Sequence, residues 1–419
     1  MRILDLVAVP GRSGFFRDDQ ASIRDGARHD GFLYEGPPST PGFHAVREPG
    51  VAVSIMLLLD GGRVAYGDCA EVQYAGVGGR APLITPGTLV AEIDRAVRPA
   101  LVGREITGFR GVAAEIDALR PGGRPLSTAL RYGISQALLD AAAQTAHVTM
   151  AEVVRDEYDT GVRIAPVPLY AQSGDERYTN VDKMIVKRVD VFPHGLINAV
   201  EGKLGSDGRL LLDYVGWVSN RITTLGAPGF TPVIHIDVYG TLGIIFDGDL
   251  DRIAIYLGEL QRRAAPFRLR VEHPVDGGDR EAQIESYVKL RGCLTARGVE
   301  IELVADEWCN TLDDIRAFIA AGAADMIQVK TPDLGGIGNV VEALLEVRRA
   351  GIGAFCGGTC NETDVSARVS AHVAMACGAS QVLAKPGMGV DEGLMVVGNE
   401  MTRVAALADT RQPRRPIEQ

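Results

Sequence analysis

Residues 311–355 indicate the architecture most clearly and read TLDDIRAFIAAGAADMIQVKTPDLGGIGNVVEALLEVRRAGIGAF. Thr311 precedes a segment whose apolar residues recur at helical spacing, and Gly322 follows it, which predicts a capped helix. Residues 325–330 (DMIQVK) then form a short, mostly apolar run that predicts a strand. A helix followed directly by a short strand is typical of a repeated βα architecture.

The next unit repeats this order. After the glycine-rich loop at 333–338, Asn339 and Glu342 predict the start of a second helix, Gly351 predicts its end, and residues 352–355 predict the next strand. This alternation predicts a parallel sheet whose strand count approaches that of a closed (β/α) barrel. Further strands are expected at residues 167–171, 184–189, 233–237, 267–272, 301–306 and 382–385.

The first 160 residues have a different pattern. Residues 51–59 and 64–68 are strand-like, whereas apolar side chains within 130–141 recur at helical spacing. This half therefore predicts an α+β domain that packs as a cap on the barrel. The expected organisation is an N-terminal α+β capping domain at 1–160, a (β/α) barrel domain at 161–409, and a tail at 410–419 that is rich in Arg and Pro.

Composition narrows the class of function. The chain has 419 residues and a net charge of −11, without a basic cluster, so we expect no nucleic-acid partner and no anionic membrane surface. The longest apolar run, 51–59, is far shorter than the roughly 20 residues that cross a bilayer, and no secretory signal is recognised. The 6 cysteines form no CxxC pair, which favours reduced thiols in the cytoplasm. Small-molecule chemistry is the expectation that remains.

Three acidic residues each end a predicted strand: Asp237 after VIHI, Glu272 after LRV and Asp306 after LVA. Because the active sites of (β/α) barrels lie at the carboxyl ends of their strands, the three carboxylates should converge there. Converging carboxylates repel one another unless a cation lies among them, and hard oxygen ligands favour Mg²⁺. Each acid alone could be a helix cap or a surface residue, but the set predicts a magnesium site.

Lys330 ends the strand that follows, and Gln328, two residues earlier, should point to the same side of it. A divalent cation can lower the pKa of a neighbouring lysine and leave a neutral amine that abstracts a proton. Lys330 is therefore a candidate general base. The alternative is a structural ion pair with one of the nearby acids.

The order of these residues is similar to that of the enolase superfamily, in the segments HID (235–237), VEHP (271–274), ADE (305–307) and QVKTPDLGGIG (328–338). Four further segments resemble those of methylaspartate ammonia-lyases: HDGF (29–32), QSGD (172–175), FPHGLIN (192–198) and GGTCNET (357–363). The resemblance covers nearly the whole chain. Its specificity rests on the combination, since each short segment could recur by chance.

The resemblance implies that the domain at 161–409 is an enolase-type (β/α) barrel, a modified TIM barrel, and that it is the catalytic domain. It also implies elimination of ammonia from (2S,3S)-3-methylaspartate to give mesaconate, with Mg²⁺ as cofactor, K⁺ as activator and a homodimer as the assembly. It implies that Asp237, Glu272 and Asp306 hold the metal and that Lys330 removes the proton from C3. His194 would stand on the opposite face of the substrate as the base for the other C3 epimer. The residues implied to contact the amino dicarboxylate are Gln172, His194, Gln328, Thr359, Cys360 and, near the C3 substituent, Leu383.

Other interpretations of the same residues remain open. Another enolase-type enzyme, a dehydratase, racemase or cycloisomerase, would share the metal and the proton abstraction but not the leaving group. A non-catalytic barrel could bind a dicarboxylate without chemistry. His194, in a Pro-His-Gly loop, could be structural, and Cys360 has no histidine beside it that would make it a nucleophile. The glycines at 335–338 lack the lysine of a phosphate-binding P-loop.

Overall fold

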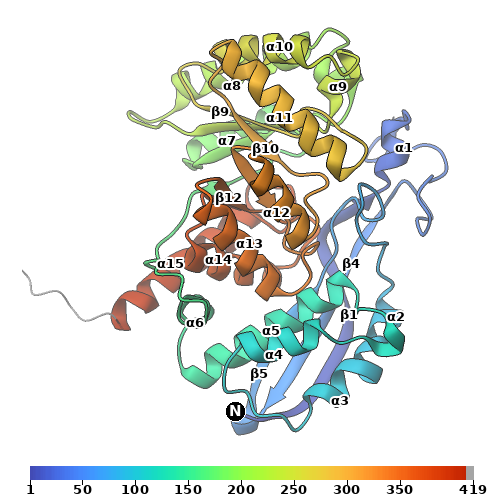
Figure 1. Ribbon diagram of the computed structural model, residues 1–419, viewed down its shortest axis with the longest axis vertical. Coiled ribbons are helices and arrows are strands. Elements are labelled where there is room, and N and C mark those ends of the chain that lie inside the picture. Colours follow the sequence, from blue (N-terminus) through green and yellow to red (C-terminus); the bar gives the residue numbers. More distant parts are fainter. Residues whose placement is uncertain (412–419) are drawn as a thin grey trace, which may run out of the picture.

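The computed structural model describes residues 1–411, which form two parts lying against each other (Figure 1). The N-terminal part contains a three-stranded antiparallel sheet in the order β1-β4-β5. The second part is a closed barrel of eight parallel strands in the order β10-β11-β12-β13-β6-β7-β8-β9. The predicted fold, a (β/α) barrel with an N-terminal α+β cap, is confirmed.

The capping sheet is covered by the long helix α5 (Thr128–Ala146), which lies across β4 (Arg47–Leu59) and β5 (Arg63–Cys69). The Ser127 hydroxyl caps α5 by accepting a hydrogen bond from the Leu130 amide at 3.2 Å. A Cβ on Gly133 would lie 2.5 Å from the Cys69 amide nitrogen, so only glycine permits this close packing. The other elements of this part are β1 (Ile3–Asp18), α1 (Gln20–Arg24), the hairpin β2 (His29–Asp30) and β3 (Leu33–Tyr34), α2 (Pro86–Glu92), α3 (Arg98–Leu101), α4 (Arg110–Asp117) and α6 (Met150–Glu157).

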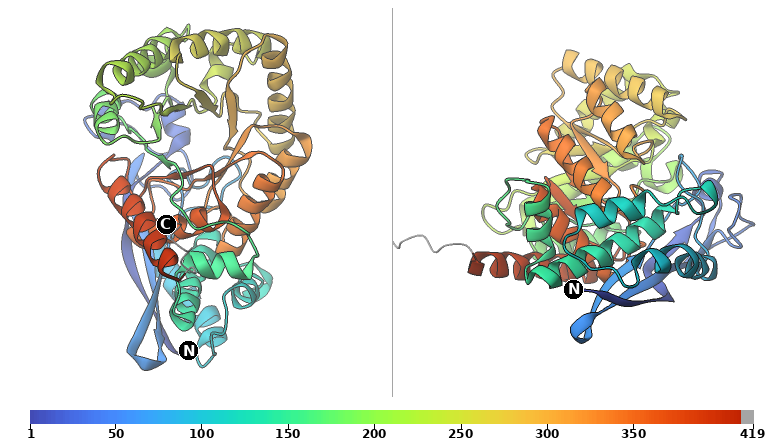
Figure 2. Two further views of the ribbon diagram at one scale, coloured as in Figure 1. Left: turned by 90° about the vertical axis from the view of Figure 1, so that its left-hand side faces the viewer. Right: turned by 60° about the horizontal axis from the view of Figure 1, so that its bottom comes forward.

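The barrel strands are short, and helices surround them (Figure 2). The strands are β6 (Leu169–Tyr170), β7 (Val191–His194), β8 (Val233–Asp237), β9 (Leu269–Glu272), β10 (Glu302–Ala305), β11 (Met326–Val329), β12 (Gly353–Cys356) and β13 (Gln381–Leu383). The helices are α7 (Arg177–Val186), α8 (Arg209–Leu225), α9 (Thr241–Ile245), α10 (Leu250–Ala264), α11 (Arg280–Ala296), α12 (Leu312–Ala321), α13 (Ile337–Arg349), α14 (Asp364–Cys377) and α15 (Glu392–Arg411).

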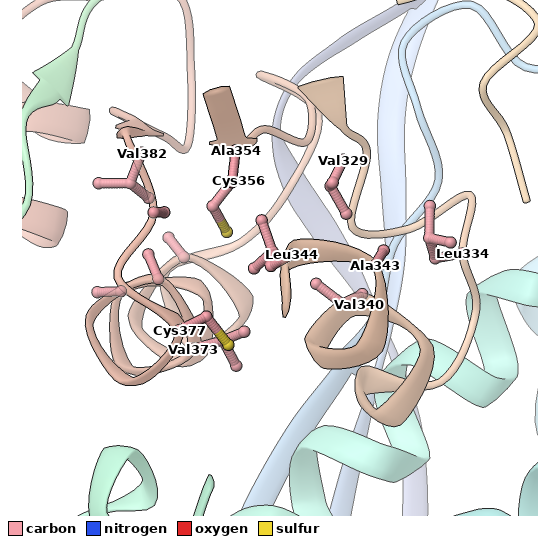
Figure 3. Close-up of a cluster of buried hydrophobic side chains, with 14 of the residues drawn as sticks. Val329, Leu334, Val340, Ala343, Leu344, Ala354, Cys356, Val373, Cys377 and Val382 are labelled. Carbon is pink, nitrogen blue, oxygen red and sulfur yellow. The ribbon is translucent and has the colours of Figure 1, made fainter. Parts of the chain in front are cut away.

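Side chains point alternately outward and inward along the barrel strands, which divides the core into two clusters. Side chains that face outward from the barrel, such as Val329 and Cys356, pack against α13 and α14, where Figure 3 shows Leu344 turned toward Cys356. Side chains that face inward form a separate cluster within the barrel. Every second residue of a strand therefore belongs to the barrel interior, and that parity turns Asp237 of β8 and Gln328 of β11 inward, whereas His194 of β7 has the parity of the outward-facing Phe192. The inner cluster consists of Tyr170, Val191, Val304, Met326, Phe355 and Leu383.

One predicted strand is wrong. Residues 184–189 do not form a strand, because Val181, Met184 and Ile185 lie on one buried face of α7. Their spacing is helical, and the apolar run was too short to separate the two periods. The strand of this unit is β7, which begins at Val191.

The predicted start of the helix at Asn339 is also wrong. Helix α13 begins at Ile337, after Gly336, without a side-chain cap. The Ile337 amide instead donates to the Ser135 hydroxyl of α5 at 2.9 Å, so the capping domain supplies the partner. A partner 202 residues away in sequence leaves no local pattern that would predict it.

The predicted C-terminal tail begins at Thr410, but Thr410 and Arg411 still belong to α15. The rest of that tail, 412–419, lies outside the described residues. Across residues 1–411, no helix combines the length and apolar character that a membrane crossing requires.

Candidate active site

The three predicted acids converge at the carboxyl ends of three neighbouring barrel strands. Asp237 ends β8, Glu272 ends β9 and Asp306 directly follows β10, and these strands are adjacent in the barrel. All three side chains are buried, and one carboxylate oxygen from each lies within 4.8 Å of the other two. That span fits hard-oxygen coordination of a Mg²⁺ ion at about 2.1 Å per oxygen, so the residues fit the cation that the sequence implies.

Lys330 and His194 flank this group of acids from opposite sides of the barrel. His194 ends β7 and Lys330 follows β11, and these two strands lie four positions apart in the closed ring of eight. The Lys330 ammonium is 2.5 Å from Asp306 Oδ1, whereas His194 Nε2 is 3.4 Å from Asp237 Oδ2. A molecule bound over the acids would therefore have a nitrogen base on each side.

Burial and mutual repulsion make this cluster of acids electrostatically costly. Burial, followed by the charges of Asp237 and Asp306, raises the pKa of Glu272 well above its ordinary value. Burial also raises the pKa of Asp306, although Lys330 opposes that shift. Carboxyl groups whose ionisation is penalised in this way are stabilised as carboxylates by a cation held among them.

The pKa of Lys330 differs from the expectation of a lowered value. Burial and Arg80 act to lower it, but the carboxylates of Asp306 and Glu307 outweigh them, so the pKa is raised. Glu307 is itself ionised, because its pKa is lowered. Although burial opposes its ionisation, Arg80 and Lys330 bring its pKa down to about 2. With Asp306 free to contact Lys330, the lysine is held as an ammonium ion.

The other half of the barrel mouth carries the predicted substrate contacts. Thr359 and Cys360 follow β12, and Gln172 follows β6. The buried Oε1 atom of Gln172 has no hydrogen-bond partner among the residues that the structure describes. Burial raises the pKa of the Cys360 thiol, which keeps it protonated and unsuited to nucleophilic attack. Gln328 lies on the acidic side, where its amide donates to Glu272. All four residues line one cavity together with Asp237, Asp306, Lys330 and His194.

Leu383 is placed differently from the other predicted residues. It is 1% exposed and belongs to the apolar cluster inside the barrel, in company with Tyr170 and Phe355. It does not line the cavity that the other predicted residues share. Contact between Leu383 and a C3 substituent therefore stays a prediction.

Sequence reasoning misses four cavity residues from the capping domain: Val72, Gln73, Tyr74 and Arg80. The backbone amide of Gln73 donates to Thr359 Oγ1 at 3.1 Å, and the side-chain Oε1 of Gln73 accepts from the Cys360 thiol at 3.1 Å. Arg80 pairs with Glu307 and donates from Nε to Asp333 at 3.2 Å. The available signal was the long aperiodic segment between β5 and α2, since loops of that length are often functional.

A buried ion pair beneath the substrate loop was also missed. Lys385 and Glu362 are both fully buried, with 2.7 Å between Nζ and Oε1. Glu362 also accepts from the Thr359 amide at 3.1 Å and from the Tyr132 hydroxyl of α5 at 2.6 Å. The pair therefore ties the loop that carries Thr359 to the capping domain. A lysine within the apolar run VLAKP was the signal that could have indicated it.

A barrel that is closed at its mouth by a separate α+β domain, with acids and nitrogen bases on its strand ends, has the architecture of the enolase superfamily. The muconate lactonizing enzyme of Pseudomonas fluorescens shares this fold, with a TM-score of 0.59 at 18% identity over 89% of this chain and 84% of that one.

Comparison with known proteins narrows the class. The family models described as methylaspartate ammonia-lyase N-terminus and C-terminus match residues 1–159 and 161–410. The chain is 53% identical to the methylaspartate ammonia-lyase of Clostridium tetanomorphum over 98% of this chain and 100% of that protein. It therefore belongs to the methylaspartate ammonia-lyase family, and members of this family are carbon–nitrogen lyases.

Two solved structures of this family are closely similar. The Mg complex of β-methylaspartase from Clostridium tetanomorphum matches with a TM-score of 0.93 at 53% identity, over 98% of this chain and 100% of that one. The methylaspartate ammonia-lyase of Citrobacter amalonaticus, solved with (2S,3S)-3-methylaspartic acid, matches with a TM-score of 0.95 at 49% identity and the same coverage.

Proposed function

We propose that this chain eliminates ammonia from (2S,3S)-3-methylaspartate to give mesaconate, reversibly and with Mg²⁺. The observation that carries the proposal is the arrangement around the barrel mouth. Three acids occupy adjacent strands, and the two nitrogen bases flank them from strands on opposite sides of the ring. The relatives solved with Mg and with this substrate support the same assignment.

Asp237, Glu272 and Asp306 would hold Mg²⁺, one carboxylate oxygen from each. When bound, the cation would offset the negative charge that develops on the substrate carboxylate as C3 loses its proton. Asp306 matters twice, because it also contacts Lys330 at 2.5 Å. When Asp306 serves as a ligand, its hold on the Lys330 proton weakens and the lysine can act as a neutral base.

Lys330 would take the C3 proton of the (2S,3S) substrate, after which the bond between C2 and nitrogen breaks and ammonia leaves. His194 would serve the opposite face and the other C3 epimer. Its Nδ1 accepts from the Leu196 amide at 3.2 Å, which turns Nε2 toward the cavity and Asp237. Because this arrangement places the ring hydrogen on Nε2, the form that acts as a base would be the other tautomer, in which Nε2 is free to accept a proton. The ring is thereby oriented before substrate arrives.

The remaining cavity residues would bind and orient the substrate. Gln172 offers an unpartnered side-chain oxygen to the ammonium group, and Thr359 offers a hydroxyl to a carboxylate. Cys360 would contribute a hydrogen-bonding contact, and Gln328, which holds Glu272, would help to fix the metal-bound carboxylate. Leu383 would act from beneath, by limiting the space near the C3 substituent.

A direct assay tests the proposal. Purified chain with (2S,3S)-3-methylaspartate and Mg²⁺ should raise the ultraviolet absorbance as mesaconate forms, and Lys330→Ala should lower that rate by orders of magnitude while metal binding persists. Product formation without ammonia release would indicate a dehydratase, racemase or cycloisomerase. Binding of substrate without any turnover would indicate a non-catalytic dicarboxylate-binding barrel.

The finer expectations belong to the same proposal. K⁺ should stimulate turnover relative to equal ionic strength from a tetraalkylammonium salt. The chain should sediment as a homodimer and act in the cytoplasm. The six cysteines of the described residues, five of them buried, form no disulfide, a state that suits a reducing compartment.

A further inference from the structure

Both oxygens of Glu272 are held by side chains from other strands. The fully buried His235 of β8 places Nε2 at 2.8 Å from Glu272 Oε2. On the other oxygen, Oε1, Glu272 accepts from the Gln328 amide of β11. A carboxylate contacted at both oxygens from different directions has little freedom to rotate.

The hydrogen-bond directions behind His235 are fixed by an arginine. Arg270 Nη1 donates to Gln381 Oε1 at 2.6 Å, and an arginine can only donate. The Gln381 amide nitrogen must therefore face His235 Nδ1, 3.2 Å away, and donate to it. With Nδ1 accepting, the imidazole hydrogen lies on Nε2 and points at Glu272. Arg270 is anchored in turn, because its Nε donates to Glu302 at 2.9 Å.

We propose that this hydrogen-bond network, Glu302–Arg270–Gln381–His235, which is buried except at Glu302, fixes the carboxylate plane of Glu272 and makes the metal site selective for Mg²⁺ over Ca²⁺. The proposal rests on the proposed function, in that Glu272 is taken to be a metal ligand. His235 acts here as a positioning residue, since it lines no part of the substrate cavity. This hydrogen-bond network runs through the barrel interior, from the start of β10 to the barrel mouth.

Selectivity follows from the different demands of the two ions. Mg²⁺ requires near-ideal octahedral geometry at about 2.1 Å, whereas Ca²⁺ accepts six to eight oxygens at roughly 2.3–2.6 Å and often turns a carboxylate to bind through both oxygens. A carboxylate that cannot turn suits the first ion and penalises the second. Removal of such a supporting hydrogen bond typically costs about 10–100-fold in metal affinity.

The competing explanation is that His235 only fills the core. Its ring stacks on Tyr170 at 4.4 Å with an interplanar angle of 13°, so packing alone could account for its burial. Tyr170 provides the matched control, because its buried hydroxyl has no hydrogen-bond partner within residues 1–411. Tyr170→Phe perturbs the same stack without touching the chain of hydrogen bonds.

The experiment measures Mg²⁺ and Ca²⁺ dissociation constants by calorimetry on metal-free, full-length enzyme. His235→Phe should weaken Mg²⁺ binding by about 10–100-fold and should reduce the ratio of the Ca²⁺ to the Mg²⁺ dissociation constant. His235→Gln, whose amide can still donate to Glu272, should stay within a few-fold of the parent chain. Tyr170→Phe should match the parent in both constants.

The outcomes separate this inference from the proposed function. If the parent chain binds no Mg²⁺, the metal site itself is wrong. If the parent binds Mg²⁺ and folded His235→Phe keeps both constants, or Tyr170→Phe reproduces the loss, the positioning role is overturned. Should His235→Phe not fold, Gln381→Leu decides, since it frees the imidazole tautomer and should lower the same ratio; an unchanged ratio would overturn the inference.

Discussion

Replacing Lys385 by Met tests the buried ion pair that supports the substrate loop. The ammonium donates to Thr331 Oγ1 at 3.0 Å, to the Gly357 carbonyl at 2.9 Å and to Glu362 Oε1 at 2.7 Å. Lys385→Met retains most of the side-chain volume but removes the charge and all three donors. Glu362 would then be a fully buried carboxylate without its cation.

The expected loss in the free energy of unfolding is large because only one partner of the ion pair is removed. Breaking a buried pair in this way costs about 3–5 kcal/mol, since the remaining charge is left uncompensated. Glu362 keeps its bonds from Tyr132 and Thr359, which places the loss toward the lower end of that range. In a barrel domain of about 250 residues, where 1 kcal/mol shifts the Tm by about 2 °C, a loss of about 3 kcal/mol corresponds to a fall in Tm of about 6 °C.

Urea unfolding followed by circular dichroism measures the loss, and a second substitution tests its cause. Glu362→Gln added to Lys385→Met should recover part of the stability, because the orphaned charge is gone. Lys183→Met is the matched control, since its pair with Asp391 lies at the surface and its removal should not measurably change the Tm. A loss below about 1 kcal/mol in Lys385→Met, or a double variant no more stable than the single one, would refute the reasoning.

Three further outcomes are expected. His194→Ala should abolish turnover of the (2S,3R) epimer while sparing the (2S,3S) epimer in the mesaconate assay, and an equal loss on both would make the histidine a substrate-positioning residue instead. Mg²⁺ should raise the Tm of the metal-free chain in a concentration-dependent way, an effect that Asp306→Asn should reduce strongly; an equal rise in that variant would remove Asp306 from the metal site. Burial raises the pKa of Glu71 to about 7. Because the pKa of Glu71 is higher in the folded state than in the unfolded state, its contribution to stability is full below about pH 4.5 and is lost as the pH rises through 7. In urea unfolding, Glu71→Gln should therefore gain on the order of 3 kcal/mol of stability relative to the parent between pH 4 and 8. A difference between the two proteins that stays constant with pH would contradict the assignment.

The acids and the lysine could be predicted because their positions depend on local pattern alone. Asp237, Glu272 and Asp306 each terminate a short apolar run, and parallel strands place their carboxyl ends on one side of a sheet. Inward parity then relates Gln328 to Lys330 without any knowledge of the tertiary structure. The same reasoning failed at 184–189, where a brief apolar run satisfied both the helical and the strand period.

The contributions of the capping domain could not be predicted in this way. Gln73 reaches Thr359 across 286 residues of sequence, and Arg80 reaches Glu307 across 227. Both residues lie in an aperiodic segment, so neither hydrophobic pattern nor capping chemistry indicates where they point. The strand that contains Leu383 could be predicted, but the depth of Leu383 in the barrel could not. That depth depends on how Tyr170 and Phe355 pack around it.

The charge balance at the barrel mouth therefore depends on a positive charge from the capping domain, the guanidinium of Arg80. Besides the three proposed metal ligands, the mouth holds Glu307 and Asp333, which are buried and pair with Arg80 of the capping domain. Without that guanidinium, Lys330 would be the cation nearest to both carboxylates, which would bind its proton more tightly and oppose its action as a base. Arg80 thus acts on the proposed chemistry from outside the barrel. The cap therefore brings to the acidic strand ends the positive charge that pairs with Glu307 and Asp333.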